Sequence, residues 1–168
     1  VIQSIADDHP RAGRVEVDPA YEPETMAEAD EYLSKLVREL CACVQEERSD
    51  RNASLCKAVR AYLETAYADD ACCPAQVADH FHLSLGQLNR IYKQRFGVGL
   101  ATALDEVRMA KAKALLTETA HSIKDIVAYV GYGDVNNFIR KFKKHEGMTP
   151  LVYRKKMAVS ADIQAVEG

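Results

Sequence analysis

Two groups of polar and basic residues are spaced so that each can lie on one face of a helix. The first group occupies positions i, i+3, i+4 and i+7 of one segment and consists of Gly86, Asn89, Arg90 and Lys93. The second group, on a later segment, consists of Asn136, Asn137, Arg140, Lys141 and Lys144. Arginine can bond two acceptors of guanine and asparagine can bond adenine, whereas lysine more often contacts phosphates. This pattern favours a surface that reads DNA.

The two groups occupy equivalent positions of an internal repeat. An offset of 50 residues aligns Leu88 with Phe138 and Arg90 with Arg140, and Lys93 and Gly97 also have like counterparts. Each copy predicts a helix, a tight turn and a second helix, and the second helix of such a unit can enter a major groove. For any single Arg or Lys, a solvated helix surface is the simpler interpretation. Two basic faces in equivalent positions favour DNA binding.

The net charge of −3 hides an uneven distribution along the 168 residues. Residues 1–54 hold 6 Lys/Arg against 13 Asp/Glu, whereas residues 87–156 hold 14 against 6, which is a local net charge of +8. Positive charge in that window is what phosphate neutralisation requires. The acidic total therefore does not exclude nucleic acid as a partner.

Caps and periodicity predict the helices that position both faces. Ser84, Ser122 and Asp134 are candidate N-caps, and Thr149-Pro150 begins a last short helix over about residues 151–157. Between the copies, residues 100–117 predict a linker helix about 27 Å long. Recognition helices in successive major grooves lie roughly 34–36 Å apart. We therefore expect one chain to occupy two successive grooves.

An amphipathic helix is predicted over about residues 25–47, after the capping box Thr25-x-x-Glu28. The polar run over residues 49–52 interrupts its periodicity and marks the best domain boundary. The predicted architecture is all-α: an acidic connecting segment over residues 1–54, a double helix-turn-helix domain over residues 55–157, and a flexible tail over residues 158–168. Docking of the 25–47 helix on a globular neighbour is favoured over pairing with a second copy.

Several motifs resemble those of the AraC-type transcriptional regulators, whose DNA-binding domain has two helix-turn-helix units joined by a long helix. The resemblance covers about residues 55–157 and rests on Val130-Gly131-Tyr132, on residues 138–144, on Gly147-Met148-Thr149-Pro150, on Tyr153-Arg154 and on the linker pattern with Leu104, Arg108 and Leu115. It implies sequence-specific promoter binding and regulation of transcription, usually activation through contact with RNA polymerase. It also implies a DNA-reading role for Gln87, Asn89, Arg90 and Lys93, and for Asn136, Asn137 and Arg140.

The first copy departs from the family pattern, because Gly86 replaces a larger outward side chain and His82 stands where the turn often has Gly. We therefore expect the first copy to read bases less strictly than the second. The run from Tyr132 to Arg154 looks most like the large members in which a sensor, sometimes membrane-anchored, precedes the DNA-binding domain. In that case the 25–47 helix transmits a signal or joins two copies in a homodimer.

Two other classes of protein stay open at this stage. Five cysteines, an odd number without a Cys-x-x-Cys pair, favour free thiols in a reducing cytoplasm. Because alkylation-repair proteins with a reactive Cys can share this DNA-binding module, such a protein is one alternative, and a helical protein-interaction module is another. The sequence shows no catalytic constellation and no His pair at i, i+4, so we expect no enzyme activity, no metal and no cofactor.

Overall fold

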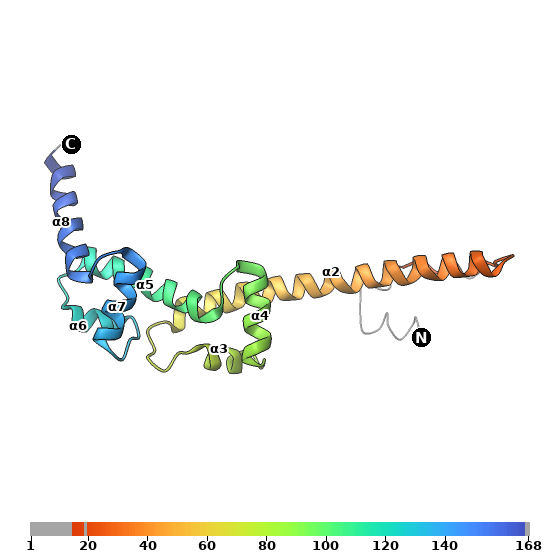
Figure 1. Cartoon of the computed structure of the whole chain (residues 1–168), viewed down its shortest axis with the longest axis horizontal. Helices are drawn as coiled ribbons and strands as arrows, with labels where there is room; N and C mark the ends of the chain where they lie inside the picture. Colours follow the sequence, from red (N-terminus) through yellow and green to blue (C-terminus); the bar gives the residue numbers. More distant parts are fainter. Residues whose placement is uncertain (1–14, 19, 167–168) are drawn as a thin grey trace. The chain divides into compact units, whose positions relative to one another are not determined.

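The computed structural model describes residues 15–18 and 20–166, and the chain divides into two compact units, Val1–Leu55 and Cys56–Gly168. The described residues form seven α-helices and no strand, so the all-α prediction is confirmed (Figure 1). The helices are α2 (Met26–Ala66), α3 (Pro74–His80), α4 (Leu85–Phe96), α5 (Leu100–Glu118), α6 (Ile123–Tyr129), α7 (Val135–Glu146) and α8 (Pro150–Val166). None of the described helices is long and apolar enough to cross a membrane.

Helix α2 corrects the prediction that the amphipathic helix ends near Glu47 and that residues 49–52 interrupt it. The structure has a single helix from Met26 to Ala66. The polar run contains neither Gly nor Pro, and its Ser, Asp and Asn residues each cost less than about 0.7 kcal/mol relative to Ala in a helix. Arg51 also bonds to Glu47 one turn earlier, with Nη2 and Oε2 3.3 Å apart. A run of weak helix formers is therefore not enough to end the helix.

The predicted caps in the second unit are confirmed. The side chain of Ser84 accepts a hydrogen bond from the Gln87 amide, that of Ser122 from the Asp125 amide, and that of Asp134 from the Asn137 amide. Helices α4 and α7 both end at a glycine in the left-handed conformation, at Gly97 and Gly147. These signals fix where both second helices begin and end.

Each helix-turn-helix copy packs on part of the linker helix α5. Helices α3 and α4 contact each other and α5, while α6 contacts both α5 and α7 (Figure 1). The core of the second copy is built around Phe138 and Phe142 of α7, which lie against buried residues of α5 and α6. Helix α5 has 19 residues and is therefore about 28 Å long, which agrees with the predicted linker.

Helix α8 is longer than the predicted short helix over residues 151–157. It runs to Val166, and residues 158–166, which the sequence predicts as a tail, contain neither Gly nor Pro to end it. Near its start, Arg154 donates to the carbonyl oxygens of Leu116 (3.2 Å) and His121 (2.6 Å). This arginine satisfies carbonyls at the end of α5 and joins α8 to the linker helix.

Candidate nucleic-acid interface

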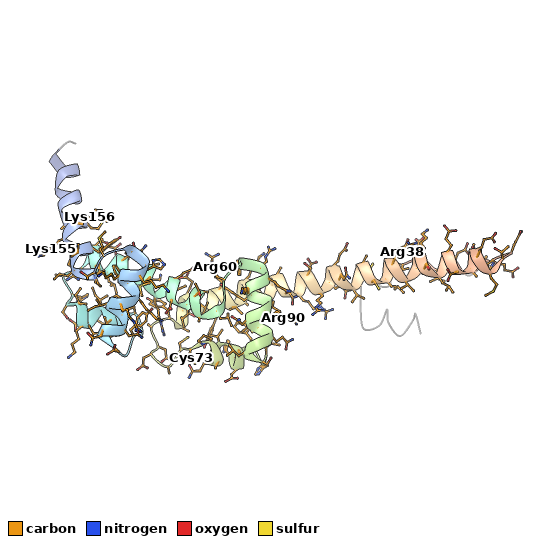
Figure 2. All side chains as sticks on the ribbon, in the orientation of Figure 1. Arg38, Arg60, Cys73, Arg90, Lys155 and Lys156 are labelled. Atoms are coloured by element: carbon orange, nitrogen blue, oxygen red, sulfur yellow. The ribbon has the colours of Figure 1, made fainter. Side chains whose placement is uncertain are left out.

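Helices α4 and α7 each present polar and basic side chains to solvent. On α4 these include Gln87, Arg90 and Lys93, and Figure 2 labels Arg90 on this helix. On α7 they include Asn136, Arg140 and Lys144. Arg90 and Arg140 occupy the same position of the repeat, and each is the sixth residue of its helix, so both copies expose an arginine at the same place.

Asn89 does not belong to this exposed set. Its side chain is half-buried, and its Oδ1 accepts a hydrogen bond from the amide of Leu100, 3.0 Å away. It thereby satisfies one of the free amides at the start of α5, for which Gly99 offers no side chain. The repeat could have indicated that Asn89 faces inward, because it aligns with Ile139, a residue packed against the second core.

Lys141 also has a structural partner. Its Nζ lies 2.8 Å from Oδ1 and 2.7 Å from Oδ2 of Asp105 on α5, and 5.4 Å from the centre of the Tyr132 ring. At an offset of 50 residues it aligns with Ile91, which is buried. Lys141 therefore attaches α7 to α5, and the structure does not group it with the exposed side chains of α7.

The remaining α7 residues form a small pre-arranged group. Asn137 is half-buried, and its Oδ1 accepts a hydrogen bond from Nη2 of Arg140 at 3.1 Å. Since a side chain that is already held loses less rotational freedom on binding, this contact favours a defined direction for the arginine. Asn136, Asn137 and Arg140 together could bond purine edges in a major groove.

The turns of the two copies use different residues for the same backbone conformation. His82 has φ 54° in the first copy, and Gly131, its counterpart at an offset of 49, has φ 75° in the second. A left-handed conformation is easy for glycine and costs other residues roughly 1–2 kcal/mol. The first copy therefore forms its turn with a residue for which the left-handed conformation is unfavourable.

Among the exposed residues outside the predicted site, two could contact DNA. Lys143 is exposed on α7 and is the repeat counterpart of Lys93, so the same alignment could have added it as a phosphate contact. Leu85 is exposed at the first position of α4, whereas its counterpart Val135 packs against the second core. An exposed apolar side chain at the start of a recognition helix can contact the methyl group of thymine.

The five cysteines differ in exposure, since Cys41 and Cys73 are exposed and Cys43 is half-buried. Cys56 and Cys72 are buried, and burial raises the pKa of both thiols, which disfavours the reactive thiolate. Within residues 15–18 and 20–166, no three His, Cys, Asp or Glu side chains come together in a group that could hold a metal ion.

Comparison with known proteins agrees with this geometry. Residues 77–156 match a family described as a helix-turn-helix domain. The HTH-type transcriptional activator RhaS of Salmonella arizonae is 33% identical over 124 residues, which are 74% of this chain and 44% of that protein. The chain thus spans less than half the length of this curated relative.

Solved structures show the same fold. The C-terminal domain of the two-component response regulator yesN from Fusobacterium nucleatum matches with a TM-score of 0.57 and 36% identity, over 58% of this chain and 95% of that one. A transcriptional regulator from Chromobacterium violaceum, described as having an AraC-type DNA-binding domain, matches with a TM-score of 0.54 and 25% identity, over 60% of this chain and 88% of that one. In both cases the match covers most of the solved chain.

Proposed function

The chain belongs to the AraC-type family of helix-turn-helix transcriptional regulators, and from this premise we propose that it binds promoter DNA sequence-specifically through α4 and α7. The observation that carries the proposal is the exposed Arg90 and Arg140 at one position of two copies. Each follows a capped helix start in a unit whose other face is buried.

The two helices contribute unequally to base reading. On α7, Asn136, Asn137 and Arg140 read bases, and the exposed lysines 143 and 144 neutralise phosphates. On α4, base reading is left to Gln87 and Arg90, with Lys93 on the phosphates, because Gly86 has no side chain and Asn89 holds the start of α5. The second copy therefore supplies most of the sequence specificity.

One chain reads two successive major grooves. The linker helix of about 28 Å places one copy toward each end, and successive grooves on one side of DNA lie roughly 34–36 Å apart. The span of a helix plus the units that flank it fits this separation, so the chain needs no dimer to occupy both half-sites.

The partners beyond DNA follow from the family. The regulator activates transcription through contact with RNA polymerase and works in the cytoplasm, where promoters are. It has no catalytic activity, and no observation favours the alkylation-repair alternative. A cysteine nucleophile would need an accessible thiolate; burial works against one at Cys56 and Cys72, whereas Cys41 and Cys73 are exposed.

Docking is the favoured expectation for the 25–47 helix, but three of its apolar side chains are exposed, so a homodimer through residues 25–47 is a further part of the proposal. Met26, Leu33 and Val37 of α2 are 87%, 59% and 56% exposed, and a second copy of this helix would cover them. Sedimentation of the chain at increasing concentration should show a dimer, and changing Leu33 and Val37 to Glu should abolish it. An unchanged sedimentation coefficient in that double variant would refute pairing through this face.

The experiment that tests the function is selection of bound sequences from a random duplex pool, followed by footprinting on the selected site. We expect two short preferred blocks one helical turn apart, and affinity that falls steeply with salt. Recovery of random sequences, or a footprint over a single groove, would contradict the proposal. Salt-independent binding would instead point to a protein-interaction module.

A further inference from the structure

The turn of the second copy lies directly against the loop that leads into the first copy. Gly131 has a left-handed φ of 75°, and a Cβ built on it would collide with the carbonyl oxygen of Tyr67 and would lie 3.1 Å from the carbonyl carbon of Ala68. Only a hydrogen atom fits between the two backbones. Two segments more than 60 residues apart in the sequence are therefore in close contact.

One arginine holds this contact together. Arg108 of α5 is only 7% exposed; its Nε donates to the carbonyl oxygen of Tyr67 (2.9 Å), and its Nη2 donates to those of Asp69 (2.8 Å) and Cys72 (3.1 Å). The guanidinium also lies 5.3 Å from the centre of the Tyr132 ring. A charge this buried is stabilised only while all of its partners stay in place.

The chain of contacts continues to the recognition helix of the second copy. The Tyr132 hydroxyl donates to Oδ1 of Asp105 at 2.8 Å, and the same carboxylate binds Lys141 of α7. Burial is the main cause that raises the pKa of Tyr132, so this hydroxyl keeps its proton and remains a donor. We name the set formed by the loop carbonyls of residues 67–72 with Asp105, Arg108, Gly131, Tyr132 and Lys141 the inter-copy clasp.

We infer that the inter-copy clasp fixes the separation and rotation of α4 and α7 and thereby determines which half-site spacing the protein accepts. The inference rests on the proposed reading of two successive grooves. One added base pair moves a half-site by about 3.4 Å and rotates it by about a tenth of a turn. A rigid pair of helices cannot follow that change, whereas two units free to move on α5 can. The members of the clasp act as positioning residues.

The test compares affinities for duplexes that differ only in the spacing of the selected half-sites. Dissociation constants are measured by fluorescence anisotropy for the selected spacing, for one or two base pairs added or removed, and for each half-site alone. For the unmodified chain we expect at least a tenfold loss when one base pair is added, equivalent to losing about one bidentate base contact.

Two glycines provide a matched pair of variants. Gly131→Ala and Gly147→Ala place Ala at nearly the same backbone angle, φ 75° and 74°, but a Cβ at Gly147 meets nothing within 4 Å. We expect Gly131→Ala to bind each half-site alone as the unmodified chain does while accepting the altered spacings within about threefold. Gly147→Ala should keep the original spacing preference.

A second variant keeps the test decisive if Gly131→Ala does not fold. Arg108→Lys retains the charge but cannot reach three carbonyls with a planar fork, and it should broaden the spacing preference in the same way. If a folded variant keeps the spacing preference of the unmodified chain, the clasp does not determine the half-site spacing. If the unmodified chain binds the double site no more tightly than one half-site, the two-groove proposal fails, and the inference falls with it.

Discussion

The ammonium group of Lys141 and the carboxylate of Asp105 form a close pair between α7 and α5, with Nζ 2.7 Å from Oδ2. The same lysine stands over the ring of Tyr132. A lysine held in this way contributes to the position of α7 and is poorly placed to neutralise a phosphate. Lys144, one turn away on an exposed part of the helix, is better placed for that role.

Methionine substitutions at these two lysines should therefore have opposite effects. Lys141→Met should reduce the free energy of unfolding by up to about 1 kcal/mol and leave the salt dependence of DNA affinity unchanged. Lys144→Met should leave stability unchanged and reduce the slope of log K against log salt by about 1. Urea denaturation and binding titrations at several salt concentrations measure both quantities. A reduced slope in Lys141→Met would return that residue to the DNA interface.

Arg140→Ala should weaken binding to the selected sequence by about 1–3 kcal/mol and reduce the preference for the base that it contacts. The reason is the loss of a bidentate bond from a guanidinium that Asn137 already holds. Competition with duplexes substituted at single positions measures the preference. An equal loss on random DNA would show that Arg140 contacts a phosphate only.

Asn89→Ala should act on stability and leave base preference unchanged. The substitution removes the acceptor for the Leu100 amide, and the loss of such a helix cap costs about 0.5–2 kcal/mol. Gln87→Ala, two residues earlier and exposed, is the matched control, with the reverse expectation. Thermal unfolding and a repeated sequence selection separate the two effects. If Asn89→Ala selects a different DNA sequence, Asn89 contacts bases.

His82→Gly should stabilise the chain by about 0.5 kcal/mol. Glycine removes the roughly 1–2 kcal/mol cost of the left-handed conformation, and part of that gain is offset by about 0.4–1 kcal/mol of additional freedom in the unfolded chain. His82→Ala is the control, because the left-handed conformation is as unfavourable for alanine as for histidine. Equal stabilisation by alanine would attribute the gain to removal of the imidazole ring.

Glu146→Gln should destabilise the protein at neutral pH but not in acid. A hydrogen bond from Lys113, whose Nζ is 2.9 Å away, is the main cause that lowers the pKa of this carboxyl group. Its contribution, up to about 1 kcal/mol for a partly exposed pair, is present above its ordinary pKa of 4.5 and disappears as the pH falls through the lowered value. The stability difference between the two proteins should therefore be full at neutral pH and shrink steadily once the pH falls below 4.5. A difference that stays constant between neutral pH and the acid limit of folding would contradict this account.

The repeat, the caps and the linker helix could be predicted because their signals are local. Ser84, Ser122 and Asp134 each bond an amide only three residues away, and the buried faces of α4 and α7 recur every three or four positions. Each of these relationships involves residues that are close together in the sequence. The basic faces of α4 and α7 follow directly from them.

The contacts between the copies could not be predicted in the same way. Arg108 has a charged side chain on an amphipathic helix, yet it is buried, because its acceptors are carbonyls of a loop 36 to 41 residues earlier. Lys141 and Asn89 likewise have partners on α5 that periodicity does not reveal. Polar side chains on a helix face look alike in sequence whether they meet solvent or a distant acceptor.

The close approach at Gly131 fixes the order of the two helix-turn-helix copies along the chain. If the two helix-turn-helix copies exchanged places in the chain, the imidazole of the first turn would have to occupy the space taken by the Tyr67 carbonyl. Reading residues on α4 and α7 can be exchanged without meeting this obstacle, since they face outward. Chimaeric regulators with new binding sites should therefore be made by transplanting helix surfaces, with each turn left in its own copy.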